Sequence, residues 1–397
     1  MVEWKELGEV ASYYRGVTYN KKQEVSLNSG GTKILRANNI TLGTNSINYD
    51  DIKEIDSSVR IKNYQWLYPN DILICAGSGS KEHVGKVAFI DKQIGYAYGG
   101  FMGKIVTASS LNPRFLFHII CSSLFKDYLK VALNSTTINN LNAEIVNCFI
   151  IPIPSLSEQN RIVGILDTFT DSIENLKQQI AQRRKQYEHY REKLLDLEGK
   201  PKEDIKKFGD YCVMIKGNGV QKTDFVDEGI GCIHYGQIYT HYGSFTYTTN
   251  KFVSKEVFEK AKKASKGDII MTDTSENVED ICKSVAYLGE DDIAVSNHAL
   301  IIKHEQNPKF LSYSTLTSSF FNQKRKVVFG VKVSGIKPDH LAQIQIYLPV
   351  IEEQNRIVSI LDTFEASISN LEAQLEQRQK QYEYYRNKLL SFEKEEQ

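Results

Sequence analysis

One twelve-residue segment occurs twice in this chain, and this repeat constrains the fold more than any other feature. The segment EQNRIVGILDTF occupies residues 158–169, and EQNRIVSILDTF occupies residues 353–364. Between 158–195 and 353–390, 27 of 38 aligned positions are identical. Two copies of this length predict two equivalent structural elements in an internally repeated fold.

The apolar positions of both copies follow a helical pattern. Their spacing alternates between four and three residues, which is typical of an α-helix that packs against another helix. The pattern has one gap, at Arg183 in the first copy and at Arg378 in the second. The Ser155-x-x-Glu158 capping pattern marks the start of the first helix, and Gly199 marks its end. We therefore predict two helices, each about 60 Å long at 1.5 Å per residue, that pack on each other.

Polar positions of the two helices also recur, although a helix face that meets only water has no need to keep them. We predict that one kind of partner protein contacts both copies; the alternative is that the repeat reflects recent duplication alone. The residues assigned to this contact are Glu158, Gln159, Arg161, Gln186 and Arg191, with their counterparts Glu353, Gln354, Arg356, Gln381 and Arg386.

The segments that precede the two helices are related more distantly. The aligned pairs are LGEVASYYRG (7–16) with FGDYCVMIKG (208–217), ILRANNI (34–40) with CIHYGQI (232–238), NDILICAG (70–77) with GDIIMTDT (267–274), VGKVAFI (84–90) with CKSVAYL (282–288), and NPRFL (112–116) with NPKFL (307–311). Short β-branched runs broken by Gly, Asn and Asp predict strands and turns, and NPRFL opens a capped helix with proline at its first position. The predicted architecture is α+β, with a domain at 1–154, a helix at 155–198, a second domain at 199–349 and a helix at 350–397.

Composition narrows the class of protein. The 49 Lys and Arg residues balance 49 Asp and Glu residues, which argues against a simple basic nucleic-acid-binding protein. The six cysteines form no C-x-x-C pair and the eight histidines have no metal-ligand spacing, so no metal site is predicted. The chain has no run of eighteen apolar residues, and its N-terminus lacks the pattern of a signal peptide. We expect a cytoplasmic protein with no membrane association.

No catalytic motif is found in the sequence. GSKEHVGKV (79–87) is similar to a phosphate-binding loop, but it has five residues between its glycines and Val87 in place of Ser or Thr. NPRF and NPKF lack the second proline of the amino-methyltransferase loop, and no glycine-rich S-adenosylmethionine loop follows a predicted strand. We predict that the chain is not an enzyme and has no cofactor of its own.

Two related but different domains suit a ligand with its own repeat along its length, and duplex DNA is the leading candidate. Polar loop residues of both halves are candidates for contacts with bases and phosphates. In the first half these are Tyr14, Arg15, Lys33, Arg36, Asn38, Asn39, Ser78, Ser80, Lys81, Thr136 and Thr137. In the second half they are Lys216, His234, Tyr235, Gln237, Tyr239, His241, Tyr242, Thr272, Thr274, Lys332 and Ser334.

The doubled P-x-x-x-E-Q-N-R-I-V-x-I-L-D motif, each copy opening a long helix after a variable α+β domain, resembles the specificity subunit of type I restriction-modification systems. The resemblance covers the whole chain and includes D-I-L-I from residue 71 and D-I-I-M from residue 268. It implies two target-recognition domains, each reading one half of a split double-stranded DNA sequence. It also implies that the two helices pack antiparallel and act as a ruler between the half-sequences.

The resemblance further implies partners for the chain. These are two copies of a modification subunit, an adenine methyltransferase that uses S-adenosylmethionine, and two ATP-dependent restriction subunits. The modification subunits would then supply much of the phosphate contact that the neutral chain lacks. Three alternatives stay open: an enzyme that acts unaided, a protein-binding scaffold with no DNA preference, and a silent member of the family.

Overall fold

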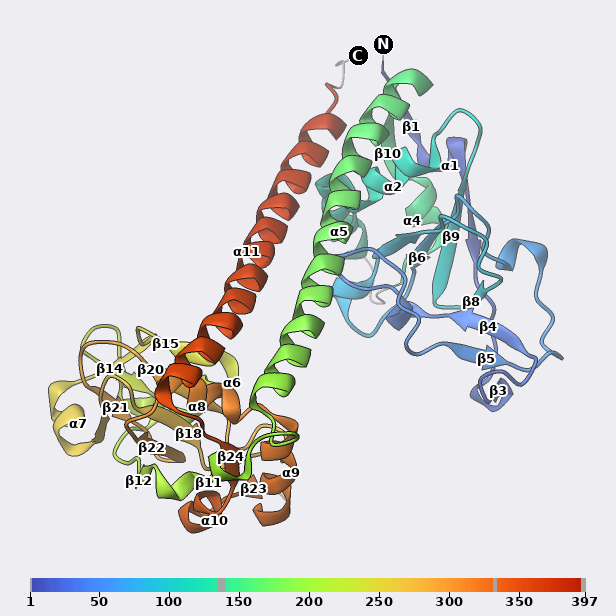
Figure 1. Cartoon of the computed structure of the whole chain (residues 1–397). Coiled ribbons are helices and arrows are strands. Elements are labelled where there is room, and N and C mark those ends of the chain that lie inside the picture. The colour runs from blue at the N-terminus through green and yellow to red at the C-terminus, as the bar shows by residue number, and fades with distance from the viewer. Residues whose placement is uncertain (1, 135–139, 331–333, 394–397) are drawn as a thin grey trace. The chain divides into compact units, whose positions relative to one another are not determined.

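The computed structural model describes residues 2–134, 140–330 and 334–393. The chain divides into two compact units (Figure 1). Each unit contains a piece of both long helices and one of the two α+β parts, residues 1–154 or 199–349, which we call the variable parts. Unit 1 consists of Met1–Lys177 with Ala373–Gln397, and unit 2 consists of Gln178–Glu372.

Unit 1 is built around small sheets. Its elements are β1 (Glu3–Glu6), α1 (Leu7–Val10), β2 (Ala11–Arg15), η1 (Lys21–Gln23), β3 (Glu24–Val25), β4 (Thr32–Leu35), η2 (Ala37–Asn39), β5 (Lys53–Ile55), η3 (Asn63–Gln65), β6 (Ile72–Cys75), η4 (Lys81–His83), β7 (Val87–Phe89), β8 (Ala97–Tyr98), β9 (Met102–Thr107), α2 (Pro113–Cys121), α3 (Ser123–Asn134), α4 (Ala143–Asn147) and β10 (Ile150–Ile153), followed by the long helix α5 (Leu156–Leu195). The strands form two four-stranded sheets, ordered β2-β9-β6-β7 and β3-β5-β4-β8, and a separate pair, β1-β10.

Unit 2 repeats this plan with additions. Its elements are η5 (Lys202–Asp204), β11 (Ile205–Lys207), η6 (Phe208–Asp210), β12 (Val213–Lys216), η7 (Lys222–Asp224), β13 (Phe225–Val226), β14 (Ile230–Ile233), α6 (Tyr235–Thr240), β15 (Phe245–Thr246), β16 (Lys251–Val253), α7 (Lys255–Lys260), β17 (Lys262–Ala264), β18 (Ile269–Thr272), β19 (Thr274–Ser275), β20 (Ser284–Tyr287), β21 (Ile293–Val295), β22 (Ala299–Lys303), α8 (Pro308–Ser314), α9 (Ser318–Val327), β23 (Ser334–Gly335), α10 (Pro338–Ala342) and β24 (Gln345–Tyr347), followed by α11 (Ile351–Leu390). Its two larger sheets have five strands each, ordered β12-β22-β18-β20-β15 and β13-β16-β14-β21-β17.

The central strands explain why the sequence repeats apolar runs at nearly the same distance from each long helix. β6 (ILIC) and β18 (IIMT) are completely buried, and each lies between two neighbours in its sheet. A strand covered on both faces has a continuous apolar run rather than an alternating one. The predicted helix caps are confirmed as well, since the Asn112 side chain accepts the Arg114 N–H at 2.8 Å and Asn307 accepts the Phe310 N–H at 3.1 Å.

Strand registers identify equivalent residues in the two units. In unit 1, Cys75 of β6 pairs with Met102 of β9, and in unit 2, Thr272 of β18 pairs with Ala299 of β22. This register agrees with the alignment of 70–77 on 267–274.

The alignment of 84–90 on 282–288 is wrong by one residue. Gly85 donates its N–H to the Cys75 carbonyl at 2.9 Å, and Cys282 donates to the Thr272 carbonyl at 3.1 Å. Both residues have positive φ, 85° and 63° respectively, so Gly85 corresponds to Cys282. The sequence alignment was shifted because it matched the identical pairs Val87-Ala88 and Val285-Ala286, whereas the strand registers place Val87 at the position of Ser284.

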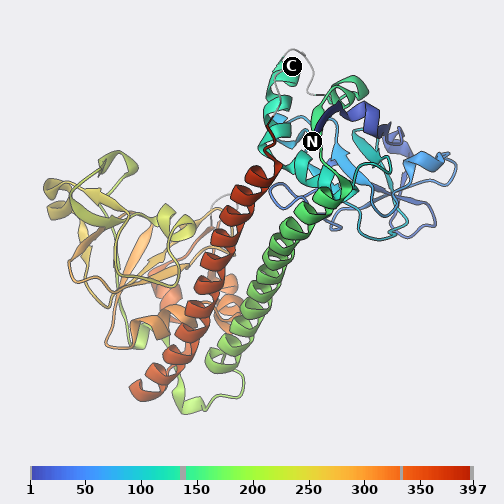
Figure 2. The ribbon, with the colours of Figure 1, turned by 90° about the horizontal axis from the view of Figure 1, so that it is seen from above.

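The long helices pack on each other within each unit. In unit 1 the Phe169 ring of α5 stacks on the Tyr385 ring of α11 at 5.4 Å, and in unit 2 Tyr190 stacks on Phe364 at 5.3 Å. The early part of one helix therefore meets the late part of the other, which makes the pair antiparallel (Figures 1 and 2).

The gap in the heptad pattern also has a structural role. The Arg378 guanidinium lies over the Phe169 ring at 5.7 Å, and the Arg183 guanidinium lies over the Phe364 ring at 5.8 Å. Arginine fits this position because its planar group packs on the aromatic face of the opposing helix while its charge stays near water.

Candidate nucleic-acid interface

Three turns of unit 1 meet where β2, β6 and β8 end. Gly77, after β6, donates its N–H to the Phe101 carbonyl in the β8–β9 turn at 3.0 Å and forms a bridge with Asn140. Arg15, at the end of β2, donates to the Asn140 side-chain oxygen at 2.8 Å. Arg36 directly follows β4, whose Leu35 carbonyl accepts the Gly99 N–H of the β8–β9 turn at 2.9 Å. Together these residues form what we call the unit 1 rim: Arg15, Arg36, Gly77, Phe101 and Asn140.

The rim of unit 1 combines a cation with an exposed aromatic ring. Arg15 bonds to neutral oxygens, those of Asn140 and the Leu141 carbonyl, so its charge stays available to an anion. Phe101 is 74% exposed, which is unusual for a ring of this size. Arg36 is paired with the Asp51 carboxylate at 2.7 Å, so its charge is partly neutralised.

The other candidates of unit 1 differ in their surroundings. Tyr14 stacks on Tyr64 at 5.3 Å, and the Lys33 ammonium lies 5.9 Å from the centre of the Tyr96 ring. Asn39 is buried, and its side-chain oxygen accepts the Arg36 N–H at 2.8 Å.

The remaining unit 1 candidates are more accessible. Asn38 is exposed and donates to the Asp51 carboxylate at 2.8 Å. Ser78 is half-buried, and its hydroxyl accepts the N–H of the exposed Ser80 at 3.3 Å, while Lys81 is exposed. Asn39 therefore has a local structural role, and the others remain candidate contacts.

Unit 2 has different side chains at the equivalent positions. The strand registers place Lys216 at the position of Arg15, Thr274 at that of Gly77 and His298 at that of Phe101. With His234 and Gly335, which correspond to Arg36 and Asn140, these residues form the unit 2 rim: Lys216, His234, Thr274, His298 and Gly335.

The unit 2 rim is a hydrogen-bonded cluster. The Lys216 ammonium pairs with the buried Asp273 carboxylate at 3.0 Å, and the Thr274 hydroxyl donates to the same carboxylate at 2.9 Å. His298 is exposed, lies 3.3 Å from the Thr274 hydroxyl through Nδ1, and packs edge-on against Tyr235 at 5.3 Å. Its φ of 65° is a left-handed conformation that a side chain rarely adopts, and such strained positions gather at functional sites.

Several unit 2 candidates are buried. His234 caps α6 by accepting the Gly236 N–H at 3.2 Å, and burial lowers its pKa. Tyr242, Thr272 and Ser334 are also buried, and burial raises the pKa of Tyr242.

The other unit 2 candidates are half-buried or exposed. The Tyr239 hydroxyl donates to the Thr274 carbonyl at 2.6 Å, which holds α6 against the rim, and burial raises its pKa. Gln237 bonds to Asn250, while His241 is exposed. Three further candidates, Thr136, Thr137 and Lys332, lie outside the described residues.

Two of the four glutamines assigned to a partner contact, Gln159 and Gln354, are completely buried. The Gln159 side chain accepts the Asn112 N–H at 2.8 Å and donates to the carbonyls of Pro154 and Ser110 at 2.9 and 3.2 Å. Gln354 makes the equivalent bond to Asn307 at 3.1 Å. Each glutamine therefore joins the start of a long helix to the cap of α2 or α8, so neither presents a surface to a partner in this structure.

The charged neighbours of these glutamines do lie on the surface. Arg161 forms a two-pronged ion pair with Glu158 at 2.8 and 2.6 Å, and Arg356 does the same with Glu353 at 2.7 Å for both bonds. An exposed pair of this kind adds little to helix stability because water screens the two charges, so stability does not explain why the pair recurs.

Further along the helices, the candidates pack on their own helix. Arg191 lies over the Tyr187 ring at 5.4 Å, and Arg386 lies over Tyr382 at 5.0 Å with only 6% of its surface exposed. Gln186 and Gln381 are half-buried, and Gln186 accepts a bond from Arg183 at 3.0 Å.

Each variable part is attached to the long helices through a buried polar cluster. In unit 1, His118 of α2 contacts Asp167 of α5 at 2.9 Å through Nε2 and the Tyr382 hydroxyl of α11 at 3.0 Å through Nδ1. Burial lowers the pKa of His118 despite the nearby carboxylate. For Asp167, burial is outweighed by the bond from His118 and the Arg114 charge, which together lower its pKa. The pair is therefore a neutral histidine that donates from Nε2 to an ionised carboxylate.

In unit 2 a tyrosine takes the place of this histidine. The Tyr313 hydroxyl lies 2.7 Å from Asp362 and 3.0 Å from Glu365, and Tyr187 donates to the other oxygen of Glu365 at 3.1 Å. Burial raises the pKa of Glu365, although the tyrosine hydroxyls oppose this effect. These clusters join the variable parts to the helices and share no residue with either rim.

The chemistry of the rims is that of recognition. Guanidinium, ammonium, hydroxyl and imidazole groups bind phosphate oxygens and base edges, and an exposed aromatic ring packs on sugars, methyl groups or bases. Among the described residues, no three His, Cys, Asp or Glu side chains are grouped to hold a metal ion. No helix in that part of the chain is both long and apolar enough to cross a membrane.

Phe101 and His298 were not predicted from the sequence as site residues. The Gly-Gly pair that precedes Phe101 was the available signal, because Gly99 and Gly100 allow a turn that brings the ring beside Gly77. No sequence pattern indicates the left-handed backbone of His298.

Comparisons with known proteins agree with this architecture. A sequence model of the type I restriction modification DNA specificity domain matches residues 1–183 and again 206–379. A putative type I restriction enzyme specificity subunit of Haemophilus influenzae is 28% identical over 98% of this chain and 96% of its own length. The EcoR124I/EcoR124II specificity subunit of Escherichia coli is 29% identical over 62% of this chain and 64% of its own length.

Two solved structures share the fold. The type I restriction-modification S subunit of M. genitalium aligns over 99% of this chain and 97% of its own, with a TM-score of 0.55 and 14% identity. A chain from a structural study of complex assembly and conformational transition of the type I R-M system covers 98% of this chain and 96% of its own, with a TM-score of 0.58 and 16% identity. With its doubled domain match, its antiparallel helices and its two variable parts, this chain belongs to the family of type I restriction-modification DNA specificity subunits.

Proposed function

We propose that this chain reads a split DNA sequence, one half through the unit 1 rim and the other through the unit 2 rim. One observation carries the proposal: the two rims occupy equivalent positions on one strand framework but present different chemistry. Arg15 is replaced by Lys216, Gly77 by Thr274 and Phe101 by His298. A framework kept with its contact residues changed is expected of two readers of two different sequences.

The side chains indicate how each half is read. In the unit 1 rim, Arg15 can form a bidentate contact with a guanine edge, and Phe101 can pack on a thymine methyl group or wedge at a base step. In the unit 2 rim, Lys216 suits a phosphate, whereas Thr274 and His298 can donate to or accept from a base edge.

The long helices provide the second part of the proposal. They set the distance between the two half-sequences and dock two modification subunits, which carry S-adenosylmethionine and the methyl transfer. The Glu158–Arg161 and Glu353–Arg356 pairs support this docking because the same exposed arrangement occurs on both helices. Restriction subunits that use ATP would complete the complex, and this chain would take no part in the chemistry.

Adenine methylation mapped by single-molecule sequencing tests the proposal. The full chain is co-expressed with its modification subunit, and a split motif with a constant gap is expected. Removing one heptad from each long helix should change the gap and leave both half-sequences unaltered. A complex that forms but methylates no split motif would instead favour a protein-binding scaffold.

A further inference from the structure

The two units differ at one edge of their main sheets. In unit 2, β15 pairs in parallel with β20 and forms the outermost strand, with Phe245 opposite Ala286. In unit 1 the sheet ends at β7, and none of the described residues adds a strand there. The corrected alignment places Phe89 of β7 at the position of Ala286.

The outer edge of β7 is ready to pair with another strand. On the inner side, Cys75 donates to the Lys86 carbonyl at 2.9 Å and Ile90 donates to the Asp71 carbonyl at 3.0 Å. Because bonds to one neighbour alternate along an antiparallel strand, the amides of Val87 and Phe89 face outward. In unit 2 the Ala286 N–H at this place donates to the Ser244 carbonyl at 2.9 Å. No described residue accepts the Phe89 N–H in the same way.

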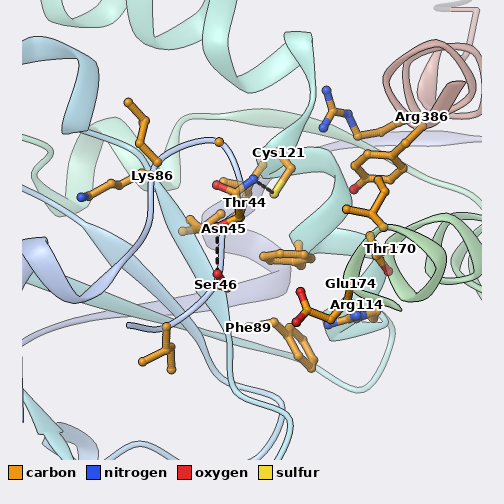
Figure 3. A pocket seen from close by; sticks show the side chains of 18 of the residues that line it. Thr44, Asn45, Ser46, Lys86, Phe89, Arg114, Cys121, Thr170, Glu174 and Arg386 are labelled. Carbon is orange, nitrogen blue, oxygen red and sulfur yellow. Dashed lines mark hydrogen bonds between the residues drawn. The ribbon is translucent and has the colours of Figure 1, made fainter. Parts of the chain in front are cut away.

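A cavity of about 770 Å³ lies along this edge (Figure 3). Its walls include Phe89 of β7, Arg114 and Phe117 of α2, and Thr170 of α5. The Thr44–Asn45 turn forms another wall, where the Asn45 amide donates to the Cys121 sulfur at 3.2 Å.

The same walls hold β15 in unit 2. Lys309, the counterpart of Arg114, places its ammonium 3.6 Å from the centre of the Phe245 ring. Ser312, the counterpart of Phe117, donates to the Ser244 carbonyl at 2.6 Å. Glu365, the counterpart of Thr170, lies 3.3 Å from the Ser244 hydroxyl. The cavity of unit 1 therefore occupies the place that a fifth strand fills in unit 2.

Differences between the walls indicate what the unit 1 cavity prefers. Phe117 replaces Ser312, so apolar rings of Phe89 and Phe117 lie beneath the Arg114 guanidinium at 4.7 and 5.4 Å. Arg386 also lines the cavity, and its buried Nε has no acceptor among the described residues. An extended main chain supplies carbonyl acceptors, and an apolar or aromatic side chain fits against the two rings.

We propose that the free edge of β7 binds an extended segment of a modification subunit as a fifth strand, parallel to β7. An aromatic side chain of that segment packs against Phe89 and Phe117 under Arg114. Small residues flank it in the segment, as Ser244 and Thr246 flank Phe245. Only the identity of the partner rests on the proposed function, because strand addition depends on main-chain bonds at the open edge and on side-chain contacts with the cavity walls, not on DNA reading.

A peptide taken from unit 2 provides the probe. The sequence GSFTYT, from residues 243–248, is added at millimolar concentration to the full chain, and amide hydrogen exchange is followed at residue resolution. Protection of the Phe89 N–H is expected. Replacing the phenylalanine of the peptide by alanine should weaken binding about tenfold, since a buried aromatic side chain is lost. A photoreactive benzoylphenylalanine in its place should cross-link to the cavity walls.

A matched pair of protein variants makes the test specific. Thr170→Glu restores the acceptor that Glu365 offers to Ser244, and it should tighten GSFTYT binding about fivefold, as one hydrogen bond would. The peptide GAFTYT should not gain from this variant. Thr168→Glu adds the same charge at an exposed position two residues away and should change nothing.

The complex with the modification subunit completes the experiment. Protection of the Phe89 N–H in the complex, with no further protection from added peptide, would support a strand from a partner subunit. An exposed Phe89 N–H in a complex that still methylates DNA would overturn the partner assignment and leave the proposed function standing. Equal affinities for Thr170→Glu and Thr168→Glu, or no protection by any peptide, would overturn strand addition.

Discussion

Replacing Gln159 by alanine distinguishes a structural glutamine from a partner contact. Its side chain makes three bonds in a fully buried place, to Asn112, Pro154 and Ser110. Alanine leaves one N–H and two carbonyls without these partners, at about 1 kcal/mol each, so we expect a loss of about 3 kcal/mol. In a unit of roughly 200 residues this corresponds to a fall in Tm of roughly 6 to 12 °C.

Differential scanning calorimetry of the full chain measures this change. Gln354→Ala should affect unit 2 in the same way, and the exposed Glu158→Ala variant should shift Tm by less than about 2 °C. A Gln159→Ala variant with an unchanged Tm that no longer co-purifies with the modification subunit would refute the structural role. It would restore the partner contact that the sequence predicts.

Four further substitutions test other parts of the structure. Phe101→Ala should relax or abolish recognition of one half-sequence, and His298→Ala should do so for the other half only, which methylation mapping measures. Neither variant should change Tm. Loss of both half-sequences in one variant would contradict separate readers. Burial lowers the folded-state pKa of His118, so the unfolded chain binds that proton at a higher pH than the folded chain does. Unit 1 should therefore keep its full free energy of unfolding above about pH 6.5 and lose part of it as the pH falls below that value. In urea unfolding, His118→Gln should remove this pH dependence. The pH dependence due to Glu365 has the opposite sign, because the raised folded-state pKa of this carboxyl favours its protonated form. Its contribution to the stability of unit 2 is complete below the ordinary carboxyl range and is lost as the pH rises through the folded-state pKa. Glu365→Gln should flatten this dependence.

Much of the fold could be predicted because its signals are periodic. The heptad spacing predicted α5 and α11, and the N-P pairs predicted the starts of α2 and α8. The register of β7 could not be predicted, because the identical pairs Val87-Ala88 and Val285-Ala286 match one residue away from the register of the strands.

The candidate site was harder to predict from the sequence. Gln159 follows Glu158 on a helix surface pattern and looks exposed; only the position of α2 shows that it is buried. Phe101 lies in the β8–β9 turn; the preceding Gly-Gly pair indicates a turn but does not indicate that the ring is exposed there. Long-range packing decided both cases.

The buried clusters that join the variable parts to the helices explain how one framework carries two different variable parts. The helix aspartate is the same in both units, as Asp167 and Asp362, whereas its partner is His118 in one and Tyr313 in the other. The helix compensates nearby, because Glu365 accepts from the tyrosine hydroxyl where unit 1 has Thr170.

A variable part moved from unit 2 onto the unit 1 helix positions would keep the bond to Asp167 and lose the one that Glu365 accepts. The loss of one buried bond costs about 1 kcal/mol, which is small against the stability of a domain. The framework should therefore tolerate exchange of its readers, while the cavity beside β7 shows that the two attachment sites are not identical. An exchanged unit 2 part would bring β15 with it and close the edge that we assign to a partner strand, so DNA reading and partner binding should separate in such a chain.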